Sequence, residues 1–187
     1  MLNKLRSQKG FTLIELSIVL VIIGVILAAV LRGQDLIDNA KAKRVASLIS
    51  QWEIPIMAHY DMKGYYPGDA GVAANAAPTG LMGGLSAVTN ALISAGITYP
   101  SPVIGDISVT TIAGAANVCG TAFSTSKNYM VIQLPATATL NLIQAIDTNI
   151  DGTALGNSGH LMNCGASGTS NATAVWATNS PYLTYIF

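Results

Sequence analysis

The chain opens with a short polar segment followed by a continuous apolar run, and this boundary is the strongest pattern in the sequence. From Phe11 to Leu31 there are 21 residues, and the stretch from Leu16 to Leu31 carries no charged side chain. At about 1.5 Å per residue, a helix of this length reaches about 30 Å, the thickness of a bilayer core. The pattern therefore predicts a membrane-spanning helix over residues 11–31, with one carboxylate, Glu15, near its beginning.

Helical periodicity continues beyond the apolar run. Apolar side chains recur at multiples of three to four residues, at Leu36, Ala40, Leu48, Trp52 and Ile56. We therefore expect one helix of about fifty residues over 11–60, whose second half, 32–60, is amphipathic and packs on a globular head formed by 61–187. Pro55 has no N–H to bond to residue 51, so we expect it to kink or end this helix.

Shorter patterns in the head predict a mixture of helices and strands. Helical spacing is found at 85–95 and 137–147. Alternating or β-branched runs predict strands over 106–112, 129–134, 173–178 and 182–187. Residues 70–84, rich in Ala and Gly, are expected to form an irregular loop. The predicted fold is α+β, with a long amino-terminal helix packed on a small antiparallel sheet.

The residues before the apolar run carry a specific motif. The leader Met1–Gly10 contains three basic residues and no acidic one, which is typical of a cytoplasmic segment. The string Gly10-Phe11-Thr12-Leu13-Ile14-Glu15 resembles the processing site of the type IV prepilin family, which includes type IV pilins and type II secretion pseudopilins. The resemblance implies that a membrane-embedded prepilin peptidase cleaves between Gly10 and Phe11 and methylates the new amino terminus of Phe11.

An ordinary secretory signal has a different layout. Its apolar core is about 7 to 15 residues long and precedes the cleavage site, whereas here the apolar run is longer and follows the glycine. A generic amino-terminal anchor remains the alternative interpretation of this segment.

Glu15 is expected to have a specific partner, because an ionisable side chain at membrane depth costs about 3 kcal/mol. The family resemblance implies that Glu15 neutralises the amino terminus of a neighbouring subunit. Docking of two subunits would then remove two unpaired charges from an apolar environment. Glu15 is therefore the predicted assembly residue.

Composition and charge limit the functions open to the rest of the chain. Of 187 residues, 51% are hydrophobic and 10% are charged, with nine basic and nine acidic side chains. No basic patch follows the apolar run, so strong nucleic-acid binding is not indicated. No nucleophile motif or histidine cluster is present either, and we do not expect an enzyme.

Two cysteines, Cys119 and Cys164, lie in the part that the resemblance places outside the cytoplasm. An even pair of cysteines in an oxidising compartment predicts one disulfide. Two free buried thiols are the alternative.

Asp147, Asn149 and Asp151 match the first half of a calcium loop, in which oxygen ligands alternate along the chain. Ser158 stands where a bidentate Glu would complete such a loop. Ca²⁺ is therefore a candidate cofactor, and a capped turn without metal is the other interpretation.

The resemblance as a whole implies a structural function. It predicts a type IV pilus subunit that crosses the inner membrane once, with its head outside the cytoplasm and lipid around its helix. An inner-membrane assembly platform would then extract processed subunits into an extracellular helical homopolymer. The alternatives are a type II secretion pseudopilin or minor pilin and, from another class, a membrane-anchored binding module that does not polymerise.

Overall fold

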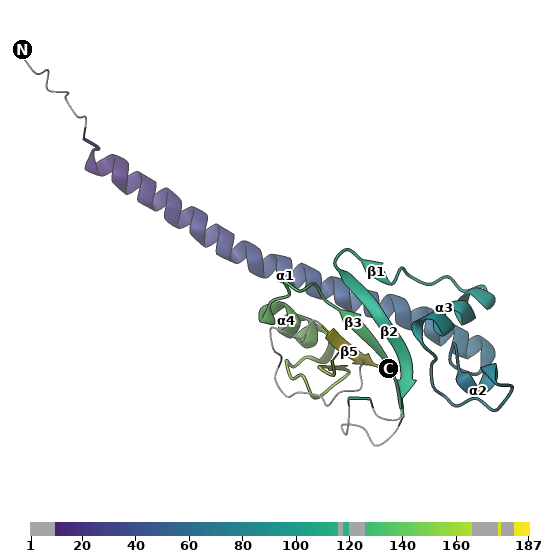
Figure 1. Cartoon of the computed structure of the whole chain (residues 1–187). Helices are drawn as coiled ribbons and strands as arrows, with labels where there is room; N and C mark the ends of the chain where they lie inside the picture. The colour runs from purple at the N-terminus through teal and green to yellow at the C-terminus, as the bar shows by residue number, and fades with distance from the viewer. Residues whose placement is uncertain (1–9, 116–117, 120–125, 166–175, 177–181) are drawn as a thin grey trace, which may run out of the picture. The chain divides into compact units, whose positions relative to one another are not determined.

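The computed structural model describes residues 10–115, 118–119, 126–165, 176 and 182–187. The chain divides into two compact units, Met1–Ile37 and Asp38–Phe187. The helices are α1 (Leu13–Lys63), α2 (Ala70–Ala73), α3 (Leu85–Ser94) and α4 (Leu140–Asp151). The strands are β1 (Val103–Ile104), β2 (Ile107–Ala115), β3 (Lys127–Gln133), β4 (Leu161–Met162) and β5 (Tyr182–Ile186) (Figure 1). The α+β class predicted from the sequence is confirmed.

The long amino-terminal helix is present, and it extends further than expected at its carboxyl end. Helix α1 contains 51 residues and continues through Pro55 to Lys63, so the prediction that Pro55 could end the helix is wrong. Pro55 is buried between Trp52 and Ile56, and the packing of this face offsets the lost backbone hydrogen bond. The helix ends instead at Gly64, whose φ of 78° suits a left-handed cap and whose N–H donates to the Tyr60 carbonyl at 2.7 Å.

The five strands form one antiparallel sheet in the order β1-β2-β3-β5-β4. β3 lies at its centre, pairing Val131 with Thr111 of β2 and with Thr184 of β5. The register shifts between Val109 and Thr111, so that β2 carries a bulge there. β2 extends beyond the predicted strand at 106–112, whereas β5 agrees closely with the predicted strand at 182–187.

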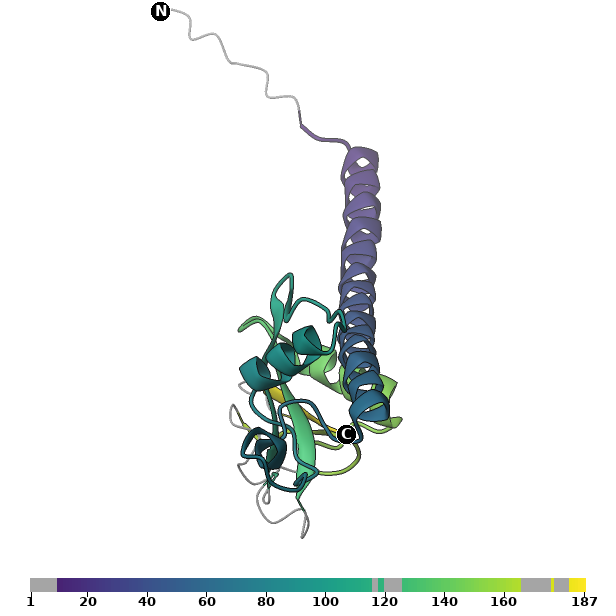
Figure 2. The same ribbon diagram turned by 90° about the vertical axis from the view of Figure 1, so that its right-hand side faces the viewer.

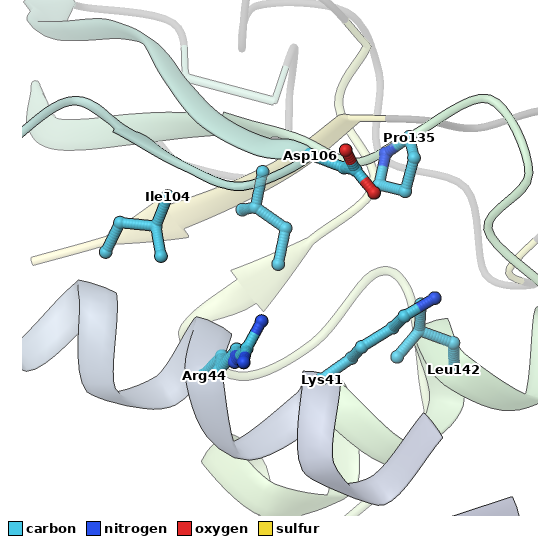
Figure 3. Close-up of a pocket in the computed structure, with 7 residues that line it drawn as sticks. Lys41, Arg44, Ile104, Asp106, Pro135 and Leu142 are labelled. Carbon is cyan, nitrogen blue, oxygen red and sulfur yellow. The ribbon is translucent and has the colours of Figure 1, made fainter. Parts of the chain in front are cut away.

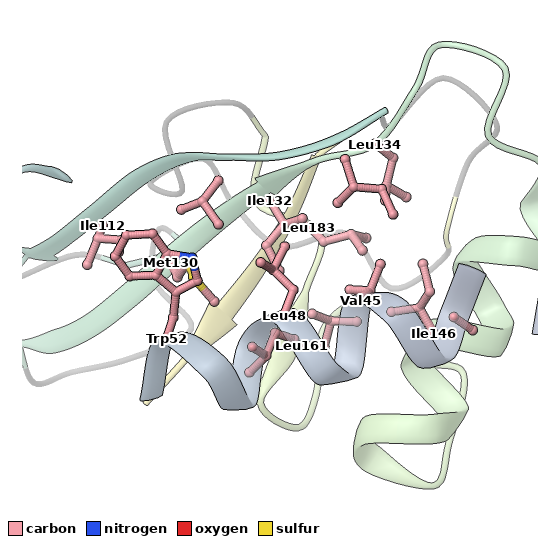
Figure 4. Close-up of a cluster of buried hydrophobic side chains, with 14 of the residues drawn as sticks. Val45, Leu48, Trp52, Ile112, Met130, Ile132, Leu134, Ile146, Leu161 and Leu183 are labelled. Carbon is pink, nitrogen blue, oxygen red and sulfur yellow. The ribbon is translucent and has the colours of Figure 1, made fainter. Parts of the chain in front are cut away.

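Both faces of the central strand are buried, which explains why its sequence is apolar at successive positions. Met130 and Ile132 point to the larger core, while Tyr129 and Val131 point to a smaller one. The larger core lies between the sheet and the Asp38–Lys63 part of α1, with α3 and α4 contributing apolar side chains (Figure 2). Its most buried large members include Leu48, Trp52, Ile112, Met130, Ile132, Leu134, Ile146 and Leu161 (Figure 4).

Residues 70–84, expected to be irregular, contain the short helix α2 and are held together by Asp69. This carboxylate is only 2% exposed and accepts hydrogen bonds from the N–H groups of Gly71, Thr79 and Gly80 and from the Thr79 hydroxyl. Burial raises the pKa of Asp69, but these hydrogen bonds outweigh it and hold the net pKa below its ordinary value. The loop is therefore organised around one buried charge.

Helix α4 is shifted along the chain relative to the helix predicted at 137–147. The helix expected at 137–147 begins later, at Leu140, because the Thr139 hydroxyl caps it by accepting from the Leu142 N–H at 3.1 Å. It also ends later, at Asp151, where Gly152 adopts a φ of 76°. The strand expected at 173–178 lies outside the described residues except for Trp176.

Candidate assembly site

The predicted cleavage point lies in an accessible stretch just before α1. Gly10, Phe11 and Thr12 are not helical, and α1 begins at Leu13. Phe11 is 89% exposed, and no atom lies within 4 Å of where a Cβ on Gly10 would be. The Gly10–Phe11 peptide bond is therefore open to an enzyme.

Glu15 and Thr12 form a capping box at the start of α1. The Thr12 N–H and hydroxyl each donate to one Glu15 carboxylate oxygen at 2.8 Å, and the Glu15 N–H donates to the Thr12 hydroxyl at 3.3 Å. The reciprocal bonds satisfy backbone donors that a helix start leaves free. Our sequence reasoning missed Thr12, although a Thr three residues before a Glu at the start of an apolar run is the usual signature of this motif.

The first unit of the chain exposes apolar side chains on every side of the helix. All residues from Phe11 to Leu31 are exposed, and the large apolar ones are between 47% and 89% exposed. Among the described residues, α1 is the one helix long and apolar enough to cross a membrane. A helix that is apolar all round must be covered by lipid or by other helices.

Glu15 lies within this apolar surface. Together with Phe11, Leu16 and Val19, it lines a surface hollow of about 210 Å³. Apart from the Glu15 carboxylate, the side chains around the hollow are hydrocarbon. A cationic group entering it would meet one negative charge in a largely apolar environment, where such a pair interacts more strongly than in water.

Cys119 and Cys164 form a disulfide, as predicted, with their Cα atoms 4.9 Å apart. Both cysteines are buried in the smaller core, where Tyr129, Val131 and Ile186 also lie. The bond therefore covers the face of the sheet opposite to α1. The alternative of two free thiols is excluded in this structure.

The three calcium candidates lie in helix α4 and not in a loop. Asn149 is exposed and donates to the Ala145 carbonyl, while Asp151 accepts from the N–H groups of His160 and Leu161 at 2.9 and 2.8 Å. Asp147 is fully buried and accepts from the Trp176 indole N–H at 2.8 Å. The candidate calcium loop is not formed here, because the three residues lie at a helix end, where helical geometry separates Asn149 from the two aspartates.

No group of three or more His, Cys, Asp or Glu side chains converges on a possible metal position within the part of the chain that the structure describes. The carboxylates of Asp147 and Asp151 are instead used to join α4 to Trp176 and to the segment leading into β4.

Asp147 should make folding stability depend on pH. Burial raises its pKa from 3.8 to about 6, despite the hydrogen bond from Trp176. The folded chain therefore holds this proton more tightly than the unfolded chain, and stability falls as the pH rises from about 4 to about 6. We expect Asp147→Asn, which keeps an acceptor for Trp176, to remove this fall and to be more stable than the wild type at pH 7 by about 2 kcal/mol.

Urea unfolding of the full chain in detergent between pH 4 and pH 7 would measure this effect. The gap between Asp147→Asn and wild type should open with rising pH, whereas two parallel curves would show that Asp147 does not change its charge on folding in this range.

Comparisons with known proteins agree with the geometry of the amino-terminal segment. The family described as "Prokaryotic N-terminal methylation motif" matches residues 5–31, which include the predicted cleavage point, the capping box and the apolar helix. The fimbrial protein EcpC of Eikenella corrodens is 38% identical over 73 residues, a match that covers 37% of this chain and about half, 48%, of that protein. No solved structure matches the chain significantly. The motif and the fimbrial relative support the type IV pilin family for the amino-terminal part of this chain, in the broad sense that includes pilins and pseudopilins.

Proposed function

We propose that this chain is a structural subunit of a type IV pilus. The observation that carries the proposal is the methylation motif placed on a helix that is exposed and apolar all round, with one carboxylate at its start. Such a helix is unfavourable in water and needs a cover throughout its life. Lipid supplies this cover before assembly, and the helices of neighbouring subunits supply it in the filament.

Processing prepares the chain for this exchange. A prepilin peptidase cuts between Gly10 and Phe11 and methylates Phe11, which removes the leader with Lys4, Arg6 and Lys9 and creates a new amino group. That amino group and Glu15 are opposite charges in apolar surroundings. Pairing the amino group of one subunit with Glu15 of the next lowers the energy of both, and so favours docking in one register.

Because lipid tails are as apolar as the helix, the exchange of lipid for neighbouring helices gains little hydrophobic free energy. Packing, charge pairing and an external motor at the inner-membrane assembly platform must therefore drive filament growth. The similarity to a fimbrial protein supports a pilus over a secretion pseudopilus.

Mass spectrometry of filaments sheared from cells tests this function. We expect a chain that begins at N-methylated Phe11, lighter than the precursor by the mass of Met1–Gly10 and heavier by one methyl group. Recovery of the processed chain from the membrane alone, never in filaments, would favour the anchored binding module. The abundance of this chain among envelope proteins would distinguish a major pilus subunit from a minor one.

A further inference from the structure

One face of α1 in the second unit is left uncovered by the sheet. The side chains facing the core include Ala42, Val45, Ile49, Trp52 and Ile56. The exposed positions on the opposite side are spaced by three, four or seven residues and lie on one line along the helix, at Ala40, Lys43, Ser47, Ser50, Ile54 and Asp61. We call these six residues the outer face of α1. Ile54 in its middle is a large apolar side chain that is 70% exposed.

The outer face carries opposite charges towards its two ends. Lys43 and Asp61 are eighteen residues apart, which is five helical turns or about 27 Å. Neither side chain has a hydrogen bond or an ion pair among the described residues, where the one ion pair joins His160 to Asp151. Both charges are therefore available to a partner.

We propose that Lys43 of one subunit pairs with Asp61 of a neighbouring copy of the same chain, along the outer faces of their α1 helices. This inference rests on the proposed function, because it takes the second copy to be a filament neighbour. Copies anchored in one membrane point the same way, so the pair forms when two helices are offset by about five turns, or about 27 Å.

The offset makes the contact heterologous. Each subunit offers Lys43 to one neighbour and Asp61 to another, so the contact does not close on itself but repeats into an open helical assembly. Antiparallel helices without an offset would pair the same two residues twice and form a closed dimer, but anchoring in one membrane excludes that arrangement.

Charge reversal should reveal the pair more clearly than neutralisation. An exposed ion pair contributes about 0 to 1 kcal/mol, whereas like charges held together at an interface cost several times more. We expect Lys43→Glu and Asp61→Lys each to lower the yield of sheared filaments by about tenfold or more, and the double exchange to restore it to within about twofold.

Lys41 supplies the matched control. It lies on a different side of α1, with Arg44 and Asp106 around a cavity of about 40 Å³ (Figure 3). Lys41→Glu combined with Asp61→Lys therefore has the same composition as the rescuing pair but should not restore filaments. The unfolding midpoint of every variant in detergent should match the wild type, since all these side chains lie outside the core.

Cysteine cross-linking provides a second measurement. In Lys43→Cys with Asp61→Cys, the two new thiols are about 27 Å apart on one rigid helix and cannot join within a chain. We expect oxidised filaments to yield a ladder of covalent multimers. Lys41→Cys with Asp61→Cys should yield none.

The outcomes separate this inference from the proposed function. If wild-type filaments form but the charge exchange fails to restore assembly, or no ladder appears, the Lys43–Asp61 contact is wrong and the pilus function stands. If the processed wild-type chain forms no filaments, both fail.

Discussion

Glu15→Gln should abolish filament assembly while leaving the chain processed and inserted in the membrane. Glutamine keeps the size of the side chain and an oxygen that can accept from Thr12, but it has no charge to pair with the amino group of a neighbour. We expect filament yield to fall by about tenfold or more, since leaving one charge unpaired in an apolar contact costs about 3 kcal/mol or more. Electron microscopy and immunoblotting of sheared filaments would measure the loss.

The capping box makes this test discriminating, because glutamine separates the hydrogen bonds of Glu15 with Thr12 from the charge pairing proposed for Glu15. Its hydrogen bonds with Thr12 stabilise the start of α1, and glutamine at this position still supports a capping box. Thr12→Ala removes the cap and keeps the charge, at a cost of about 1 kcal/mol to the helix end. Glu15→Ala removes both the charge and the side-chain oxygen that accepts from Thr12.

If charge pairing governs assembly, Glu15→Gln should be as defective as Glu15→Ala, and Thr12→Ala should be much milder. The reverse order, with Glu15→Gln assembling normally and Thr12→Ala failing, would show that the carboxylate acts on its own helix and not on a neighbour. The membrane fraction of each variant, measured alongside, controls for loss of insertion.

The parts of this structure that could be predicted from the sequence are those determined over short distances along the chain. The apolar run and the periodicity beyond it predict α1 because each helical turn depends on residues three or four apart. Pro55 shows the limit of this local reasoning. A proline in an isolated helix is a breaker, but here Pro55 belongs to a face that is buried against the sheet, and packing outweighs the missing bond.

The residues of the candidate site also fall into those that could be predicted from the sequence and those that could not. The predicted cleavage point, Thr12 and Glu15 lie within six residues of one another, and Thr12 could have been found from its spacing to Glu15. Asp147 could not, because its partner, Trp176, is 29 residues away and the two meet only through the fold. Asp147, Asn149 and Asp151 have the spacing of calcium-loop ligands. Sequence spacing does not reveal that the two carboxylates already accept hydrogen bonds from distant N–H groups.

Removal of the Cys119–Cys164 disulfide should cause the largest loss of folding stability among the changes considered. The bond joins cysteines 45 residues apart. Closing a loop of this length restricts the unfolded chain and is worth about 4 kcal/mol in the chain-entropy model. A domain of this size has a total stability of about 5 to 15 kcal/mol, so the loss would be a large fraction of the whole.

Cys119→Ala with Cys164→Ala is the suitable variant, because serine would place hydroxyl groups in the smaller core, where both cysteines are buried. Urea unfolding followed by tryptophan fluorescence would measure the change, since Trp52 is fully buried in the larger core. Wild type treated with a reductant should unfold at nearly the same urea concentration as the variant. A loss below about 1 kcal/mol would show that the segments joined by the disulfide contribute little to the cooperative fold.

The backbone at Cys119 allows a finer test of what the bond does. Its φ of 54° lies in the left-handed region, where alanine is strained by about 1 to 2 kcal/mol and glycine is not. Cys119→Gly with Cys164→Ala should therefore unfold at a higher urea concentration than the double alanine variant, even though glycine also makes the unfolded chain more flexible. If the two variants unfold together, the backbone at position 119 has relaxed once the bond is gone, and the disulfide itself holds this turn in place.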